Sequence, residues 1–161
     1  WKRLVSLDFL RKVAPEGRMV FLKDTCCDYE LIRERLKAVE GTPLKIFNAN
    51  AQSWYDSYCH GSAGYNGVMA NFHPDLYKWA YDHKDSDPEK AQLVAHFLTT
   101  AAMIEMRAYP VSAKYHQNLV DVPMSLVTRS ADAAKLDKNA RGEVESLIAM
   151  ENYVRKQLGI L

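Results

Sequence analysis

The first half of the chain alternates extended and helical patterns, with only a few residues between them. Short apolar runs typical of buried strands occupy residues 19–26 and 44–47, and a third strand is expected within residues 63–71. A helical pattern follows each run. Parallel strands need a crossover connection, usually a helix, so this order predicts a parallel sheet covered by helices.

Capping signals support the predicted helices. Ser6 can cap a first helix that Pro15 stops, and Asp28 can cap a second that ends at Gly41. A third helix is expected from Gln52 to Cys59, and Pro74 stands at the first position of a fourth.

From residue 87 onward the pattern is helical only. We expect a long apolar helix over residues 88–107, a break at Tyr109-Pro110 and a terminal helix with an apolar stripe. The sequence therefore predicts βα units over residues 1–86 and a helical carboxyl-terminal extension of the same domain over residues 87–161. Helical spacing predicts that four large apolar side chains belong to the core: Trp79, Phe97, Met103 and Met106.

Composition excludes several classes of protein. The 161 residues are 48% hydrophobic and 25% charged, which excludes disordered and fibrous chains. Lys and Arg number 21 against 20 Asp and Glu, without a basic run, so we expect no nucleic-acid partner. No apolar run reaches the roughly 18 residues of a membrane span. Three cysteines without a C-x-x-C pair favour a reducing compartment, and we expect a cytoplasmic protein.

Three parallel strands leave open sheet edges. Each crossover is right-handed and continues the sheet, so another segment or a closing barrel must cover the edges. We therefore expect further strands before residue 1.

The stretch "MVFLKDTC" places a lysine in an apolar strand. Side chains alternate along a strand, so Lys23 shares a face with Phe21 and Thr25, and Asp24 faces the other way. If that face lines a parallel barrel, Lys23 stands near the carboxyl end of its strand, where barrel enzymes place their chemistry. Partial desolvation there favours the neutral amine, which can attack a carbonyl group. The alternative is a lysine that reaches solvent at the strand end.

Four segments in the same order resemble one family. "MVFLKDTC" is similar to the active-site strand of the dihydrodipicolinate synthase and N-acetylneuraminate lyase family, the pyruvate-type class I aldolases, which are (β/α)8 barrels. "LKIFNANAQ" resembles the seventh strand, "GYNGVMAN" the eighth, and "AYPVSAKYHQNL" the Pro-x-x-x-Lys segment of the carboxyl-terminal helices. The resemblance implies the α/β fold of the carboxyl-terminal part of a TIM barrel.

The resemblance also implies a chemistry and a set of site residues. Lys23 would form a Schiff base with pyruvate or another 2-keto acid, without a cofactor or metal. Thr25 would hydrogen-bond a hydroxyl or water near the imine, unless it only fills its strand position. Asn66 falls where the family places a backbone group beside the keto acid, or it is a turn residue. Asn48 and Asn50 would line the mouth of the site, or they cap the following helix.

The chain departs from the family pattern at several points. Phe21 stands where the family usually has a small residue, and Ala51-Gln52 replaces the acidic pair of sialic acid lyases, so sialic acid is a poor substrate candidate. The family's G-x-T-G-E loop and its proton-shuttling tyrosine belong to the first half of the barrel, and neither occurs here. Activity is therefore expected to need that amino-terminal half.

Two other functions stay open. One is a keto-acid binder or scaffold that has lost catalysis, which Phe21 favours; the other is a small α/β interaction domain. The aldehyde partner and the direction of reaction are not determined by the sequence. The helix expected over residues 88–107 is apolar on two sides, which favours a homo-oligomer.

Overall fold

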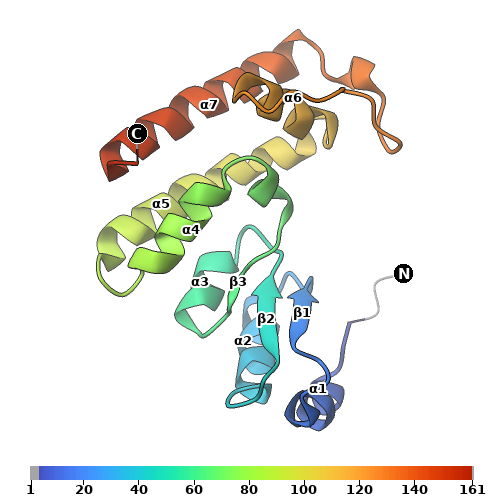
Figure 1. Ribbon diagram of the computed structural model, residues 1–161, viewed down its shortest axis with the longest axis vertical. Coiled ribbons are helices and arrows are strands. Elements are labelled where there is room, and N and C mark those ends of the chain that lie inside the picture. Colours follow the sequence, from blue (N-terminus) through green and yellow to red (C-terminus); the bar gives the residue numbers. More distant parts are fainter. Residues whose placement is uncertain (1–3, 161) are drawn as a thin grey trace. The chain divides into compact units, whose positions relative to one another are not determined.

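The computed structural model describes residues 4–160, and these form two compact units (Figure 1). The sheet unit comprises the residues up to Gly67 together with Tyr81–Pro88. The helical unit comprises Val68–Ala80 and the residues from Glu89 onward. That residues 1–86 and 87–161 belong to one domain stays a prediction.

The sheet unit contains three parallel strands in the order β1 (Phe21–Asp24), β2 (Lys45–Asn48) and β3 (Gly64–Tyr65). Lys23 is opposite Phe47, and Phe47 is opposite Gly64. The predicted parallel sheet is therefore confirmed. The third strand is shorter than the predicted run, because residues Val68–Asn71 form the 3-10 helix η2.

Helices and strands alternate in the sheet unit as the sequence predicted. Its helices are α1 (Leu7–Val13), followed by the 3-10 turn η1 (Ala14–Glu16), then α2 (Tyr29–Ala38) and α3 (Trp54–Cys59). The Ser6 hydroxyl accepts a hydrogen bond from the Phe9 N–H at 3.2 Å, and the Asp28 carboxylate accepts one from the Leu31 N–H at 2.7 Å. Both predicted N-caps are thus confirmed.

The two faces of the sheet have different surroundings. One face packs Leu22 and the buried Ile46 against an apolar cluster from α1 and α2 and the residues that follow each helix: Leu10, Ala14, Ile32, Leu36 and Val39. Full burial of each such leucine or isoleucine contributes about 1.5–3 kcal/mol. The other face carries Lys23 and Phe21, which is 49% exposed. The strands therefore have one core face and one accessible face.

The helical unit begins with η2 and the first part of α4 (Pro74–His83), whose first residue is the predicted Pro74. It continues through α5 (Pro88–Ala101), the 3-10 helix η3 (Ala102–Met106), α6 (Val111–Leu119), the 3-10 turn η4 (Ala133–Lys135) and the long α7 (Lys138–Leu158). The Tyr109-Pro110 peptide bond that separates η3 from α6 is cis.

Two of the predicted core residues are on the surface. Met103 is 60% exposed and Met106 is 76% exposed, so that part of the prediction is wrong. The expected helix over residues 88–107 ends at Ala101, and the chain continues with three residues per turn. The apolar stripe therefore rotates, and Ala102 and Ile104 are buried instead.

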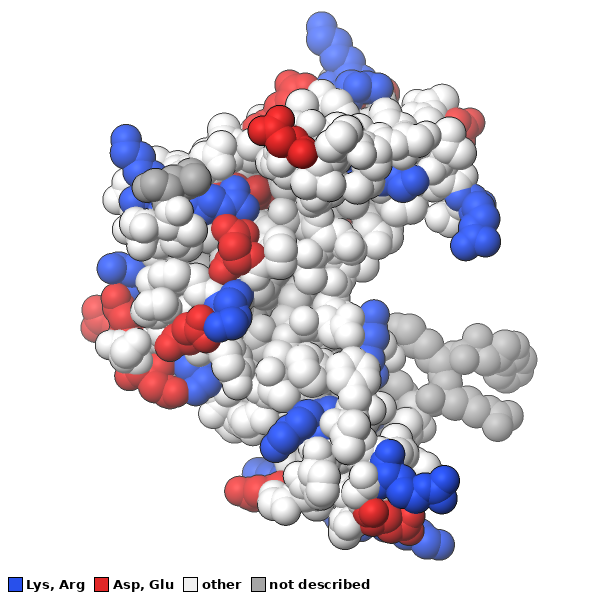
Figure 2. All heavy atoms as spheres, viewed as in Figure 1, with Lys and Arg blue, Asp and Glu red and all other residues white. Residues whose placement is uncertain are grey.

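Charged side chains of both signs are interspersed over the surface. On the face drawn in Figure 2, the described Lys and Arg residues form no continuous basic area. Within residues 4–160, no helix combines the length and the hydropathy that a membrane span requires.

Candidate active site

The accessible face of the sheet arranges side chains in three rows. The strand register places Phe21 beside Lys45, then Lys23 beside Phe47 and Gly64. One step beyond, the Ala49 N–H donates to the Asp24 carbonyl at 2.9 Å and the Asn66 N–H donates to the Asn48 carbonyl at 2.8 Å. Strand alternation then puts three residues in the last row: Thr25, Ala49 and Asn66. The sheet therefore brings Lys23, Thr25 and Asn66 onto one face.

Lys23 is exposed in the described structure. The partial desolvation of the amine was predicted only for a face that lines a closed barrel, and the alternative was a lysine that reaches solvent. A face with three parallel strands is open unless further strands curve over it. Lys23 is nevertheless the residue before the last residue of β1, near the carboxyl end of that strand.

Two aromatic rings, Phe21 and Phe47, are in contact on the accessible face. Phe47 lies in the same row as Lys23, and Phe21 lies in the row before it. The ring centroids of Phe21 and Phe47 are 4.9 Å apart. A Cβ atom on Gly64 would lie 2.5 Å from Cε1 of Phe47, so the phenyl ring occupies the space that a larger residue would need. Phe21, the departure from the family pattern, thus contributes to an apolar floor beside Lys23.

Thr25 is partly buried and directly follows β1. Its carbonyl accepts a hydrogen bond from the Cys27 thiol at 3.6 Å, and Cys27 has a φ of 57°. The chain therefore turns immediately after Thr25. The predicted contact of the Thr25 hydroxyl with a substrate stays a prediction.

Asn48 lies on the face opposite Lys23 and is buried. Its Nδ2 donates to the Ser53 and Ser57 hydroxyls at 3.0 and 3.2 Å, and its Oδ1 accepts from the Asn50 N–H at 2.8 Å. Oδ1 of Asn50 in turn accepts from the Ser53 N–H at 2.9 Å. These contacts correspond to the alternative in which both asparagines order the start of α3. The sheet does not bring Asn48 together with Lys23.

Asn66 is partly buried at the end of β3. The following residue, Gly67, is tightly enclosed: a Cβ atom there would lie 2.6 Å from the Ala49 carbonyl oxygen. Only glycine permits this close approach of backbone to backbone. Asn66 is therefore held in the last row of the accessible face, and its contact with a keto acid stays a prediction.

A buried ion pair behind Lys23 was not predicted from the sequence. Asp24 is 1% exposed and Arg35 of α2 is 2% exposed, and Nη1 of Arg35 donates to the Asp24 carboxylate. The available signal was the position of Arg35 next to Leu36, on the apolar stripe of a helix that covers the sheet. An arginine on such a stripe needs a buried acidic partner.

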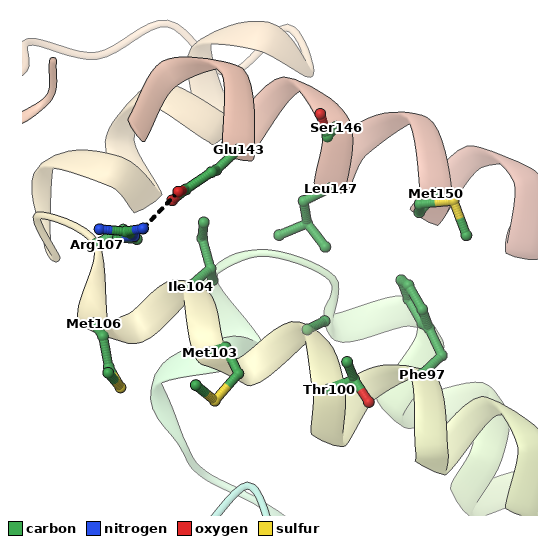
Figure 3. Close-up of a pocket in the computed structure, with 11 residues that line it drawn as sticks. Phe97, Thr100, Met103, Ile104, Met106, Arg107, Glu143, Ser146, Leu147 and Met150 are labelled. Atoms are coloured by element: carbon green, nitrogen blue, oxygen red, sulfur yellow. Dashed lines mark hydrogen bonds and ion pairs between the residues drawn. The ribbon is translucent and has the colours of Figure 1, made fainter. Parts of the chain in front are cut away.

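The helical unit contains an apolar cavity of about 700 Å³, separate from the predicted site residues. Its lining includes Met103, Ile104 and Leu147, and Figure 3 shows α7 contributing one side and α5 with η3 the other. At one end an ion pair joins Arg107 and Glu143 at 2.7 Å. None of the predicted site residues lines this cavity.

A buried polar cluster also lies in the helical unit. Glu151 of α7 accepts hydrogen bonds from His73 Nδ1 at 2.7 Å and from His116 Nε2 at 3.0 Å, and all three are 0% exposed. Burial raises the pKa of Glu151, but hydrogen bonds from His116 and His73 outweigh it and lower the pKa to about 2. Arg155 bridges Glu151 to Asp75. In the described part of the chain no group of three or more His, Cys, Asp or Glu side chains is arranged to hold a metal ion.

Comparison with solved structures decides the fold. The chain matches the dihydrodipicolinate synthase of Thermotoga maritima with a TM-score of 0.75 and 16% identity, over 91% of this chain and 50% of that one. The chain has the fold of the second half of a dihydrodipicolinate synthase barrel. The parallel strands and the helical extension predicted from the sequence are confirmed at this level.

Two further neighbours of this synthase fold were solved with pyruvate. The synthase of Acinetobacter baumannii, complexed with pyruvate, matches with a TM-score of 0.76, 15% identity and coverage of 91% and 50%. YagE of Escherichia coli K12, a prophage protein of the same family in complex with pyruvate, matches with a TM-score of 0.78 and 18% identity. The match covers 91% of this chain and 51% of that one. The chain spans about half the length of these structures. No protein-family model and no curated protein matches it.

Proposed function

We propose that this chain carries the Schiff-base lysine of a pyruvate-type class I aldolase, acting as a lyase, synthase or dehydratase on a 2-keto acid. The observation that carries the proposal is the position of Lys23 at the carboxyl end of a strand in the synthase fold, on the same face as Thr25 and Asn66. Carboxyl ends of barrel strands are where this fold places its chemistry. Two neighbours of the same fold hold pyruvate in their solved structures.

In the proposed mechanism the neutral amine of Lys23 attacks the carbonyl carbon of the 2-keto acid. The carbinolamine loses water to give a protonated imine, which accepts the electron pair left when a proton or a carbon fragment departs. The product of that step is an enamine. Thr25 would hydrogen-bond the water or hydroxyl near the imine, and Asn66 would place a backbone or amide group beside the keto acid.

The proposal includes the partners expected from the sequence. The accessible face around Lys23 needs further strands to become a barrel interior, and the amino-terminal half of the barrel would supply them.

A homo-oligomer is supported by the exposed apolar side chains of the helical unit, including Leu93 at 69% and Met106 at 76%. Light scattering after size-exclusion chromatography would contradict it by finding a monomer. The cytoplasmic location stays a prediction; Cys26, Cys27 and Cys59 are all unpaired thiols.

Borohydride trapping tests the proposed Schiff base. The protein as expressed from its own gene is incubated with pyruvate, reduced, weighed intact and mapped by peptide mass spectrometry. We expect one added group on Lys23 and none after Lys23→Arg. Lys45→Arg is the matched control, because Lys45 is exposed on the same face one row away. An unlabelled or randomly labelled folded protein would contradict the proposal.

A non-catalytic keto-acid binder is the second candidate. The Phe21–Phe47 pair favours it, because the aromatic floor reduces the space beside Lys23. Calorimetric binding of pyruvate without a trapped adduct would support this candidate over the enzyme.

A further inference from the structure

Asp24, the buried residue that follows Lys23, makes a hydrogen bond to the backbone just after β1. The Asp24 carboxylate points to the core face, where Oδ1 accepts a hydrogen bond from the Cys26 N–H at 2.8 Å. This bond spans Thr25. It therefore restricts the backbone on both sides of that residue and holds Thr25 on the face opposite Asp24.

Arg35 connects the same carboxylate to two other elements. Its Nη1 donates to Asp24 and its Nη2 donates to the Val5 carbonyl at 2.7 Å, just before the Ser6 cap of α1. One guanidinium thus joins the end of β1, helix α2 and the entry to α1. A planar guanidinium suits this arrangement, because its donors have fixed directions.

We infer that Asp24 and Arg35 are positioning residues for Lys23 and Thr25, an inference that rests on the proposed function. Asp24 is the neighbour of both residues in the chain. Because side chains alternate along the strand, the burial of Asp24 directs Lys23 and Thr25 to the accessible face. The ion pair then fixes the position and orientation of the Lys23 amine relative to the keto acid. Neither Asp24 nor Arg35 contacts the substrate in this arrangement.

The test measures the rate at which Lys23 is trapped, as a function of pyruvate concentration. The first variant is Asp24→Asn. The second is the double variant Asp24→Asn with Arg35→Gln, which removes both charges and leaves no unpaired buried charge. Asp56→Asn is the matched control, since it breaks another Arg–Asp pair of α2, in which Nε of Arg33 donates to Asp56 at 2.9 Å. That pair joins α2 to α3 and does not involve β1. All rates are compared below the melting temperature of each variant.

We expect both Asp24 variants to lower the maximal trapping rate by about 10- to 100-fold, the effect typical of a misplaced reacting group. The Asp56→Asn rate should stay within about twofold of wild type, since the partly buried Arg33–Asp56 pair joins α2 to α3 and touches neither Lys23 nor Thr25. Retention of the wild-type maximal rate by the folded double variant would overturn the inference, as would an equal loss in Asp56→Asn, which would indicate a general effect on stability. Absence of an adduct in the wild-type protein would instead overturn the proposed function, and the inference with it.

Discussion

Nδ1 of His73 donates a hydrogen bond to Oε1 of Glu151 at 2.7 Å, between residues 78 positions apart in the chain. His116 donates to the same carboxylate from α6. One buried acidic side chain thus joins the start of α4, α6 and α7. The stability of the helical unit should depend on the ionisation of Glu151.

We therefore predict loss of stability in acid. The pKa of Glu151 is lowered from 4.5 to about 2 in the folded protein. A group with a lowered pKa stabilises the fold above its unfolded value, and this contribution is lost as the pH falls through the folded value. The stabilisation should be complete above about pH 5 and should decrease toward pH 2, by roughly 3 kcal/mol. Chemical denaturation at a series of pH values, followed by circular dichroism, measures it.

Glu151→Gln is the variant that isolates this effect. It removes the titrating group while keeping one hydrogen-bond acceptor, so its stability should be lower at neutral pH and should change less between pH 5 and pH 2. Glu145→Gln is the control, because Glu145 lies exposed on the same helix and accepts from the Tyr115 hydroxyl at 2.6 Å. An unchanged acid profile in Glu151→Gln would refute the role assigned to the cluster.

The second prediction concerns the glycine under Phe47. Gly64→Ala should destabilise the sheet unit by about 1–3 kcal/mol, because the added Cβ would lie 2.5 Å from the Phe47 ring. Combining it with Phe47→Leu should recover part of the loss. Gly142→Ala is the contrasting substitution: it lies within α7 with open space around it, and should stabilise by about 0.5–1 kcal/mol. Thermal unfolding of the wild type, the two single glycine variants and the double variant measures these changes in stability. An unchanged stability in Gly64→Ala would show that the Phe47 ring moves freely.

The third prediction concerns the thiol beside the buried ion pair. Burial, together with the hydrogen bond to Asp24, raises the pKa of Cys26 to about 11 from an ordinary value of 9.0. At pH 8 its thiolate fraction should be about 100-fold below that of an ordinary thiol. Alkylation followed by mass spectrometry should therefore label the exposed Cys27 well before Cys26. Equal rates at the two cysteines would contradict the enclosed environment of Cys26.

Local signals in the sequence predicted much of the secondary structure. Ser6 and Asp28 mark helix starts through their own side chains, and Pro74 marks another by its fixed φ. The prediction failed where the helical period changed: nothing local distinguishes Met103 in an α-helix from Met103 in a 3-10 helix. The exposed fraction of that residue depends on which turn of α5 ends the regular hydrogen bonding.

Part of the candidate site was also predictable from local signals in the sequence. Alternation alone put Lys23 and Thr25 on one face, and the burial of Asp24 against Arg35 of α2 confirms that Asp24 faces the other. The asparagines were less predictable, since Asn48 and Asn50 follow an apolar strand in a pattern that fits either a substrate contact or a helix cap. Only the positions of Ser53 and Ser57 in space decide that the Asn48 amide is used within the protein.

Residues close together in the chain are enough to predict the order of strands and helices, the main helix caps and the face of β1 that carries Lys23. The tertiary structure decided which distant groups meet: Arg35 with Asp24, Phe47 over Gly64, and His73 and His116 with Glu151. Such contacts form only when separate elements pack, so no local pattern in the sequence specifies them.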